Sequence, residues 1–160
     1  MGTELESFAA TLNEEDRQLL QSSVAFVLRI VASADSVVDK KEVSALARAN
    51  DLARERFGAA FSGPSAELPE ALAAAKSNDW PQSPYVRKVA AIVKKLPEGA
   101  RKLYDRSILE LALTVADASG GGILGFGQKL SADEKYAIRR VVSALGVTIE
   151  DATARTSLGF

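Results

Sequence analysis

The chain has 160 residues, of which 47% are hydrophobic and 26% are charged, and its formal net charge at pH 7 is −1. This composition is typical of one globular domain, and the balance of acid and base favours neither nucleic acid nor an anionic membrane as a partner. Because the sequence contains no cysteine and no histidine, disulfides, thiol nucleophiles, thiolate zinc sites and imidazole bases are excluded.

The first part of the chain has the apolar periodicity of two helices. Asn13 with the acidic run at 14–16 predicts a helix start, because a capping side chain and carboxylates favour the positive end of a helix. An apolar stripe follows and ends near Ala34. Asp39 then opens a second helix, which we expect to run to about Phe57.

The middle of the chain, 61–96, is less regular. An Ala-rich stretch at 66–76 predicts a short helix, and two prolines within 77–84 predict a loop. Pro84 is typical of the first turn of the helix that follows. Trp80 is the single tryptophan, and we expect it to close the edge of the core, with stacking on a ligand as the alternative.

A long helix is predicted from Pro97, and a glycine-rich loop follows at 119–129. This loop is not a P-loop, since Gln128 stands where a P-loop has lysine and a helix rather than a strand precedes it. We interpret it as a flexible insertion. The alternative is docking of a partner or ligand by the apolar residues of the loop, which are Ile123, Leu124 and Phe126.

The last part of the chain predicts two more helices. Ser131 and Glu134 have capping-box spacing and open the first of them, which Gly146 ends. Thr148 with Asp151 caps the second. The total is about seven helices and no strand, so the predicted fold class is all-α.

A helix–acidic turn–helix motif occurs twice. Asp35 and Asp117 follow the first helix of each copy and are 82 residues apart, whereas the residues that open the second helix are 92 apart, so the second copy carries a ten-residue insertion. We predict one domain over 1–160, with repeat units 13–60 and 97–157 in a pseudo-two-fold relation. The residues at the larger offset are Val38, Glu42 and Leu46 in the first copy and Leu130, Glu134 and Ile138 in the second.

The two turns gather carboxylates at helix ends, where a cation could be held. Hard divalent cations take several oxygen ligands, so the candidates are Ca²⁺, Mg²⁺ and Mn²⁺, and zinc is excluded. The sequence has no motif for haem or a nucleotide. The candidate metal ligands are Asp35, Asp39, Glu42, Asp117 and Glu134.

Helix capping competes with metal binding as the interpretation of Glu42 and Glu134. Each lies three residues after a capping residue, and a cap stabilises a helix by about 0.5–2 kcal/mol without any metal. Asp35 and Asp117 differ, because a helix C-terminus disfavours a negative charge. We therefore expect Asp35 and Asp117 to have a compensating partner, either a cation or the N-terminus of another helix. The alternative is that the turn itself favours aspartate.

These motifs resemble those of the TerB family, which is associated with tellurite resistance and related to the TerB-like domain of DjlA. The first unit is Ala34-Asp35 followed by Asp39-Lys40-Lys41-Glu42, and the second is Ala116-Asp117 followed by 130–147. Ser36 departs from the family pattern, which has glycine after the aspartate, and Ala118 does the same in the second unit. The resemblance covers about 13–150.

The resemblance implies an all-α fold of about seven helices and divalent-cation binding by family acidic residues, which map to the five candidate ligands. It implies a non-enzymatic protein of stress response or tellurite resistance, acting as a cation-responsive interaction module with a protein partner in a stress-response or membrane-associated assembly. We expect a cytoplasmic location, no nucleic acid partner and no membrane insertion, since no apolar run approaches ~20 residues and no basic leader is present.

Two other functions stay open. One is a small-molecule-binding domain with a pocket between the two halves, closed by the glycine loop 119–129 and Trp80. The other is a carboxylate-based metal-dependent hydrolase, which lacks a clear nucleophile or base. The basic pairs at 101–102 and 139–140 are interpreted as solvated helix faces.

Overall fold

The computed structural model describes residues 4–32, 40–58, 79–120 and 132–160. Within these ranges the chain forms seven α-helices, one 3₁₀ helix and no strand, which confirms the predicted all-α class. The elements are α1 (Glu4–Ala10), α2 (Glu14–Ala32), α3 (Lys40–Phe57), η2 (Trp80–Gln82), α5 (Pro84–Lys94), α6 (Glu98–Gly120), α7 (Ala132–Leu145) and α8 (Ala152–Leu158).

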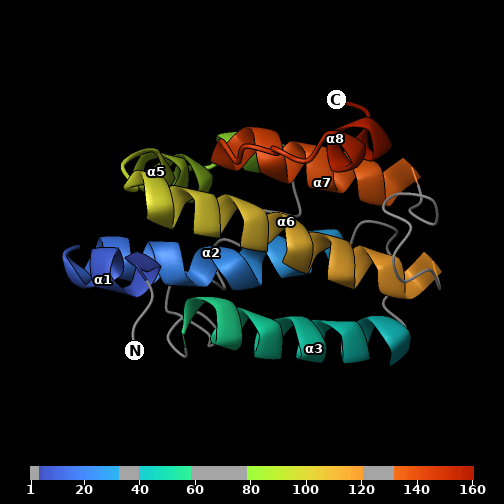
Figure 1. Ribbon diagram of the computed structural model, residues 1–160, viewed down its shortest axis with the longest axis horizontal. Helices are drawn as coiled ribbons and strands as arrows, with labels where there is room; N and C mark the ends of the chain where they lie inside the picture. Colours follow the sequence, from blue (N-terminus) through green and yellow to red (C-terminus); the bar gives the residue numbers. More distant parts are fainter. Residues whose placement is uncertain (1–3, 33–39, 59–78, 121–131) are drawn as a thin grey trace.

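The helices form three layers (Figure 1). α2 and α6 lie next to each other in the middle, α3 covers one side of them, and α5 and α7 cover the other. α1 packs against α6 and α2, and α8 packs on α7. α6 is therefore surrounded by other helices, and its buried residues are Ala100, Tyr104, Asp105, Ser107, Ile108, Leu111, Ala112, Leu113, Val115 and Ala116.

α3 packs against α6 and buries two alanines and one phenylalanine. Ala49, Ala53 and Phe57 are fully buried, and their spacing of four places them in one row along the helix. Alanine at a helix contact lets the two backbones approach closely. The helix ends at Phe57 as predicted, and Gly58 follows with a φ of 108°, a conformation that favours glycine.

Two buried serine–tyrosine pairs connect α2 to its neighbours. The Ser22 hydroxyl lies 2.6 Å from the hydroxyl of Tyr85 on α5, and the Ser23 hydroxyl lies 2.8 Å from that of Tyr104 on α6. Each serine also donates to a carbonyl of its own helix. A serine hydroxyl has one hydrogen, so the tyrosine is the donor of a pair when that hydrogen goes to the helix carbonyl. Burial raises the pKa of the Tyr104 hydroxyl well above its usual 10.0, which keeps that proton in place.

Trp80 closes the edge of the core, as predicted. It is 4% exposed, and its ring meets the Phe26 ring edge-on at a centroid distance of 5.7 Å. The segment 77–84 was predicted as a loop, but Trp80–Gln82 form one turn of 3₁₀ helix. Ser83 then caps α5 by accepting a hydrogen bond from the Val86 N–H, with Pro84 in the first turn.

Arg101 is not the solvated residue that the sequence suggested. Its guanidinium pairs with the buried Asp105 carboxylate at 3.1 Å and donates to the carbonyls of Val93 and Gly146. These carbonyls lie in the last turn of α5 and directly after α7. Arg101 therefore neutralises the negative ends of two helices and ties both to α6.

Burial makes the stability of the protein depend on the ionisation of Asp105. The carboxyl is 5% exposed, and this burial raises its pKa above the usual 3.8, although the Thr148 N–H and Arg101 oppose the shift. The folded protein then binds this proton more tightly than the unfolded chain. The contribution of Asp105 to stability is full below pH 3.8 and is lost as the pH rises through the raised pKa.

We compare how the free energy of unfolding changes between pH 7 and about pH 4.5 in the wild type and in Asp105→Asn. On acidification, we expect the stability of the wild type to rise relative to that of Asp105→Asn. Urea denaturation of both proteins at both pH values measures this difference. The asparagine variant is the control for all other carboxyl groups, which titrate in both proteins. If the wild type instead loses stability relative to Asp105→Asn on acidification, the ion pair with Arg101 affects the pKa of Asp105 more than burial does.

Several element boundaries differ from prediction. α1 was not predicted, and α6 continues to Gly120, so the first two residues assigned to the glycine loop are helical. Asp151 caps α8 by accepting from the Ala154 N–H, whereas the Thr148 N–H bonds to Asp105 instead. The predicted helix at 66–76 lies outside the described residues. No helix in the described part of the chain has the length and apolarity needed to cross a bilayer.

Candidate functional site

Four helix ends that flank the acidic turns lie at one end of the molecule. α2 and α6 run from left to right in Figure 1, and α3 and α7 run back from right to left. Ala32 and Lys40 are the helix ends on either side of the first turn, and Gly120 and Ala132 are those on either side of the second. The four helix ends that flank the two turns therefore lie towards the same end of the molecule, while the internal duplication stays a prediction.

The five candidate ligands are described to different extents. Asp35 and Asp39 lie outside the described residues. Glu42 lies in the first turn of α3 and Asp117 in the last turn of α6, so their backbones belong to helix ends on this side of the molecule, but their side chains are not described. Glu134 is the one candidate with a described side chain.

Glu134 is buried in the first turn of α7, with 4% of its surface exposed. Glutamate is almost never buried to this degree without a compensating partner. The positive end of the α7 dipole supplies part of that compensation. The predicted capping box with Ser131 stays a prediction, because Ser131 lies outside the described residues.

No group of three or more acidic side chains suited to a metal comes together within the described ranges. Four of the five candidate ligands have no described side chain, so this observation concerns the rest of the molecule. It means that no such acidic group forms among the described side chains of 4–32, 44–58, 79–116 and 132–160.

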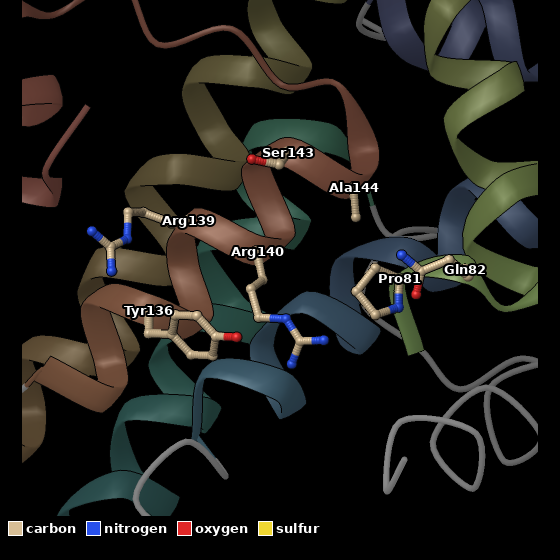
Figure 2. A pocket seen from close by; sticks show the side chains of 7 residues that line it. All are labelled: Pro81, Gln82, Tyr136, Arg139, Arg140, Ser143 and Ala144. Carbon is tan, nitrogen blue, oxygen red and sulfur yellow. The ribbon is translucent and has the colours of Figure 1, made fainter. Parts of the chain in front are cut away.

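A pocket of about 470 Å³ opens between η2 and α7 (Figure 2). The small-molecule alternative placed a pocket between the halves 13–60 and 97–157, but this one has the middle segment as one wall. The predicted closing loop, 119–129, lies outside the described residues beyond Gly120, and Trp80 is not among the residues that line the pocket. The lining residues are Pro81, Gln82, Tyr136, Arg139, Arg140, Ser143 and Ala144.

The pocket wall on α7 was only partly visible in the sequence. Arg139 and Arg140 were interpreted as a solvated face, yet the Arg140 guanidinium lies over the Trp80 ring at 5.1 Å and over the Tyr136 ring at 5.4 Å. Tyr136, Arg140 and Ala144 follow one another at a spacing of four, which places them in one row on α7. That spacing was the available signal, but nothing in the sequence placed Trp80 beside the row.

No family model, curated protein or solved structure matches the chain. The resemblance to the TerB family therefore depends on the two motifs alone.

Proposed function

We propose that the protein is a TerB-like, non-enzymatic interaction module of tellurite or general stress response, in which a divalent cation held by the two acidic turns controls binding of a protein partner. The ligands in this proposal are Asp35, Asp39, Glu42, Asp117 and Glu134.

The observation that carries the proposal is that the four flanking helix ends lie towards the same end of the molecule (Figure 1). The two turns, whose aspartates are 82 residues apart in the sequence, are therefore flanked by helix ends on the same side of the molecule. Two of the four ends are helix C-termini, α2 and α6, which carry partial negative charge, as do the carboxylates near them. A cation would offset both.

The position of Glu134 supports the same proposal. Its side chain lies in the first turn of α7, which follows the second acidic turn in the sequence, and it is 4% exposed. Oxygen ligands of this kind suit Ca²⁺, Mg²⁺ or Mn²⁺. Binding of the cation would draw the α3 and α7 N-termini towards the α2 and α6 C-termini and change the surface that a partner meets.

Calorimetric titration of the protein with Ca²⁺, Mg²⁺ and Mn²⁺ tests the proposal. We expect at least one of them to bind with a measurable heat and to raise the melting temperature, since a ligand at 100 times its Kd stabilises the folded state by about 2.7 kcal/mol. Asp35→Asn and Asp117→Asn should each weaken binding at least tenfold, because each removes one charged ligand.

The matched control is Asp51→Asn. Asp51 is an exposed aspartate on α3, about 16 Å along the helix from its N-terminus at a rise of 1.5 Å per residue. It changes the net charge by the same amount without touching the acidic turns. The proposal is wrong if none of the three cations gives a heat or a melting shift, or if all three variants bind the cation alike.

A further inference from the structure

The outward side of α5 carries a strip of positive charge, which we call the basic face. At 3.6 residues per turn its members fall within about 120° of the helix circumference. No aspartate or glutamate occurs from 80 to 97. The net charge of the whole chain is −1, so this excess of positive charge is local. The basic face comprises the exposed residues Arg87, Lys88, Ala91, Lys94 and Lys95.

Only one cation of the basic face is paired within the described part of the chain. Lys88 lies 3.3 Å from Glu15 of α2, and both side chains are more than half exposed. Arg87, Lys94 and Lys95 form no ion pair with any side chain that the structure describes. An exposed pair such as Lys88 with Glu15 is weak, so a carboxylate from another molecule can replace Glu15. Most of the positive charge is therefore available.

The packing of α5 does not account for these cations. The buried side chains of the helix lie on its other side and attach it to the core. Lysines near a helix C-terminus commonly offset the negative end of its dipole. Here the Val93 carbonyl, in the last turn of α5, already accepts a hydrogen bond from the Arg101 guanidinium. Lys94 and Lys95 add charge beyond what that helix end requires.

The spacing of the basic face matches that of another helix. Arg87 with Lys88 and Lys94 with Lys95 form two pairs of cations seven residues apart, which is about 10 Å at a rise of 1.5 Å per residue. Seven residues are nearly two turns, so a partner helix with acidic pairs at the same interval places carboxylates opposite both pairs. Ala91 lies between the pairs, and its short side chain lets the partner approach closely.

We propose that the basic face docks an acidic helical segment of a partner protein, with pairs of glutamate or aspartate seven residues apart. Exposed carboxylates nearby disfavour a broader anionic surface. Glu15, beside Lys88, is 63% exposed, and Glu98, three residues after Lys95, is 84% exposed. A membrane or a nucleic acid would meet these like charges as well, whereas one helix contacts only the basic face.

The proposal does not depend on the proposed function. α5 lies towards the end of the molecule away from the helix ends that flank the acidic turns (Figure 1). Loss of cation binding and loss of binding at the basic face can therefore be measured separately.

Fluorescence anisotropy with a labelled alanine-based peptide tests the proposal. The peptide has about 20 residues, long enough to be helical, and carries pairs of glutamates seven residues apart on one face. We expect saturable binding to the full chain, and at least fivefold weaker binding when NaCl is raised from about 0.1 M to about 1 M. A peptide of the same composition with glutamates on all faces should bind at least fivefold more weakly. Absence of saturable binding, or equal binding of the two peptides, would overturn the proposal.

Two double variants assign the binding to the basic face. Lys94→Gln combined with Lys95→Gln should weaken peptide binding about tenfold, because two of the four cations are lost. Arg29→Gln combined with Arg48→Gln is the matched control, since it removes the same charge from exposed positions on α2 and α3. Circular dichroism checks that both variants fold. Equal peptide binding by the two double variants would overturn the proposal.

A single substitution tests the position without removing a cation. Ala91→Glu keeps all four basic side chains and places a carboxylate at the centre of the basic face, so it should weaken peptide binding at least tenfold. Unchanged binding by this variant would overturn the placement of the peptide along α5.

Vesicles and an oligonucleotide test the class of partner. We expect phosphatidylserine vesicles and a single-stranded DNA oligonucleotide to bind more weakly than the acidic peptide. If either binds more tightly, and loses that affinity in the variant that combines Lys94→Gln with Lys95→Gln, the acidic protein segment is overturned as the partner. Asp117→Asn should bind the peptide normally even if it loses the cation.

Discussion

Replacement of Tyr104 by alanine is expected to lower the free energy of unfolding by about 3–5 kcal/mol. The side chain is fully buried on α6, its ring lies 6.2 Å from the Phe57 ring of α3, and its hydroxyl bonds to Ser23 of α2. The alanine variant would leave a cavity where α2, α3 and α6 meet. Urea denaturation followed by far-UV circular dichroism measures the loss.

Two further tyrosine variants separate the contribution of the Tyr104 hydroxyl from that of its ring, and compare a buried ring with an exposed one. Tyr104→Phe keeps the ring and removes one buried hydrogen bond, so it should cost about 1 kcal/mol. Tyr136→Ala removes a ring that is 54% exposed and should change stability by about 0.5 kcal/mol or less. If Tyr104→Ala were no more destabilising than Tyr136→Ala, the placement of Tyr104 in the core would be wrong.

Replacement of Arg101 by alanine is expected to cost about 2–3 kcal/mol. The variant loses the ion pair with Asp105 and the hydrogen bonds to the Val93 and Gly146 carbonyls. It also leaves the Asp105 carboxyl buried without its cation, which is the costly part of breaking such a pair. Because protonation removes that buried charge, the loss should become smaller as the pH falls towards 4.

Lys102→Ala is the control for Arg101→Ala. Lys102 pairs with Glu98 at 3.2 Å on the exposed side of the same helix, with both side chains more than half exposed. Its loss should cost about 0.5 kcal/mol or less. Arg101→Lys keeps the charge without the planar fork, so its stability should lie between those of the wild type and Arg101→Ala. Equal losses for Arg101→Ala and Lys102→Ala would contradict the structural role of Arg101.

The helices that the sequence predicted correctly are those with local signals at their ends. Asn13 bonds to the Asp16 N–H at the start of α2, Ser83 caps α5, and Gly146 ends α7 with a φ of 68°. Such caps act within one turn of helix, so they can be recognised without knowledge of the fold. The apolar stripes also predicted which face of each helix is buried.

Features that depend on contacts between distant residues could not be predicted. Arg101 has the same sequence signature as a solvated arginine, and only the positions of Val93 and Gly146 make it a structural residue. For the candidate site, the sequence indicated acidic residues at helix termini. It did not indicate at which end of the folded molecule each of these termini lies. The pocket beside Trp80 was missed for the same reason, since its two walls are more than 50 residues apart in the sequence.

The two adjacent serines of α2 restrict how α2 can pack against its neighbours. Consecutive residues of a helix point about 100° apart, so Ser22 and Ser23 address two different neighbours, α5 and α6. Apolar stripes alone tolerate several rotations of a helix that bury similar areas. A rotation of α2 by one residue would break both serine–tyrosine hydrogen bonds at once and leave buried hydroxyl groups unpaired. The two pairs therefore exclude neighbouring packings of similar hydrophobic energy, and they make α2 the element against which α5 and α6 are both aligned.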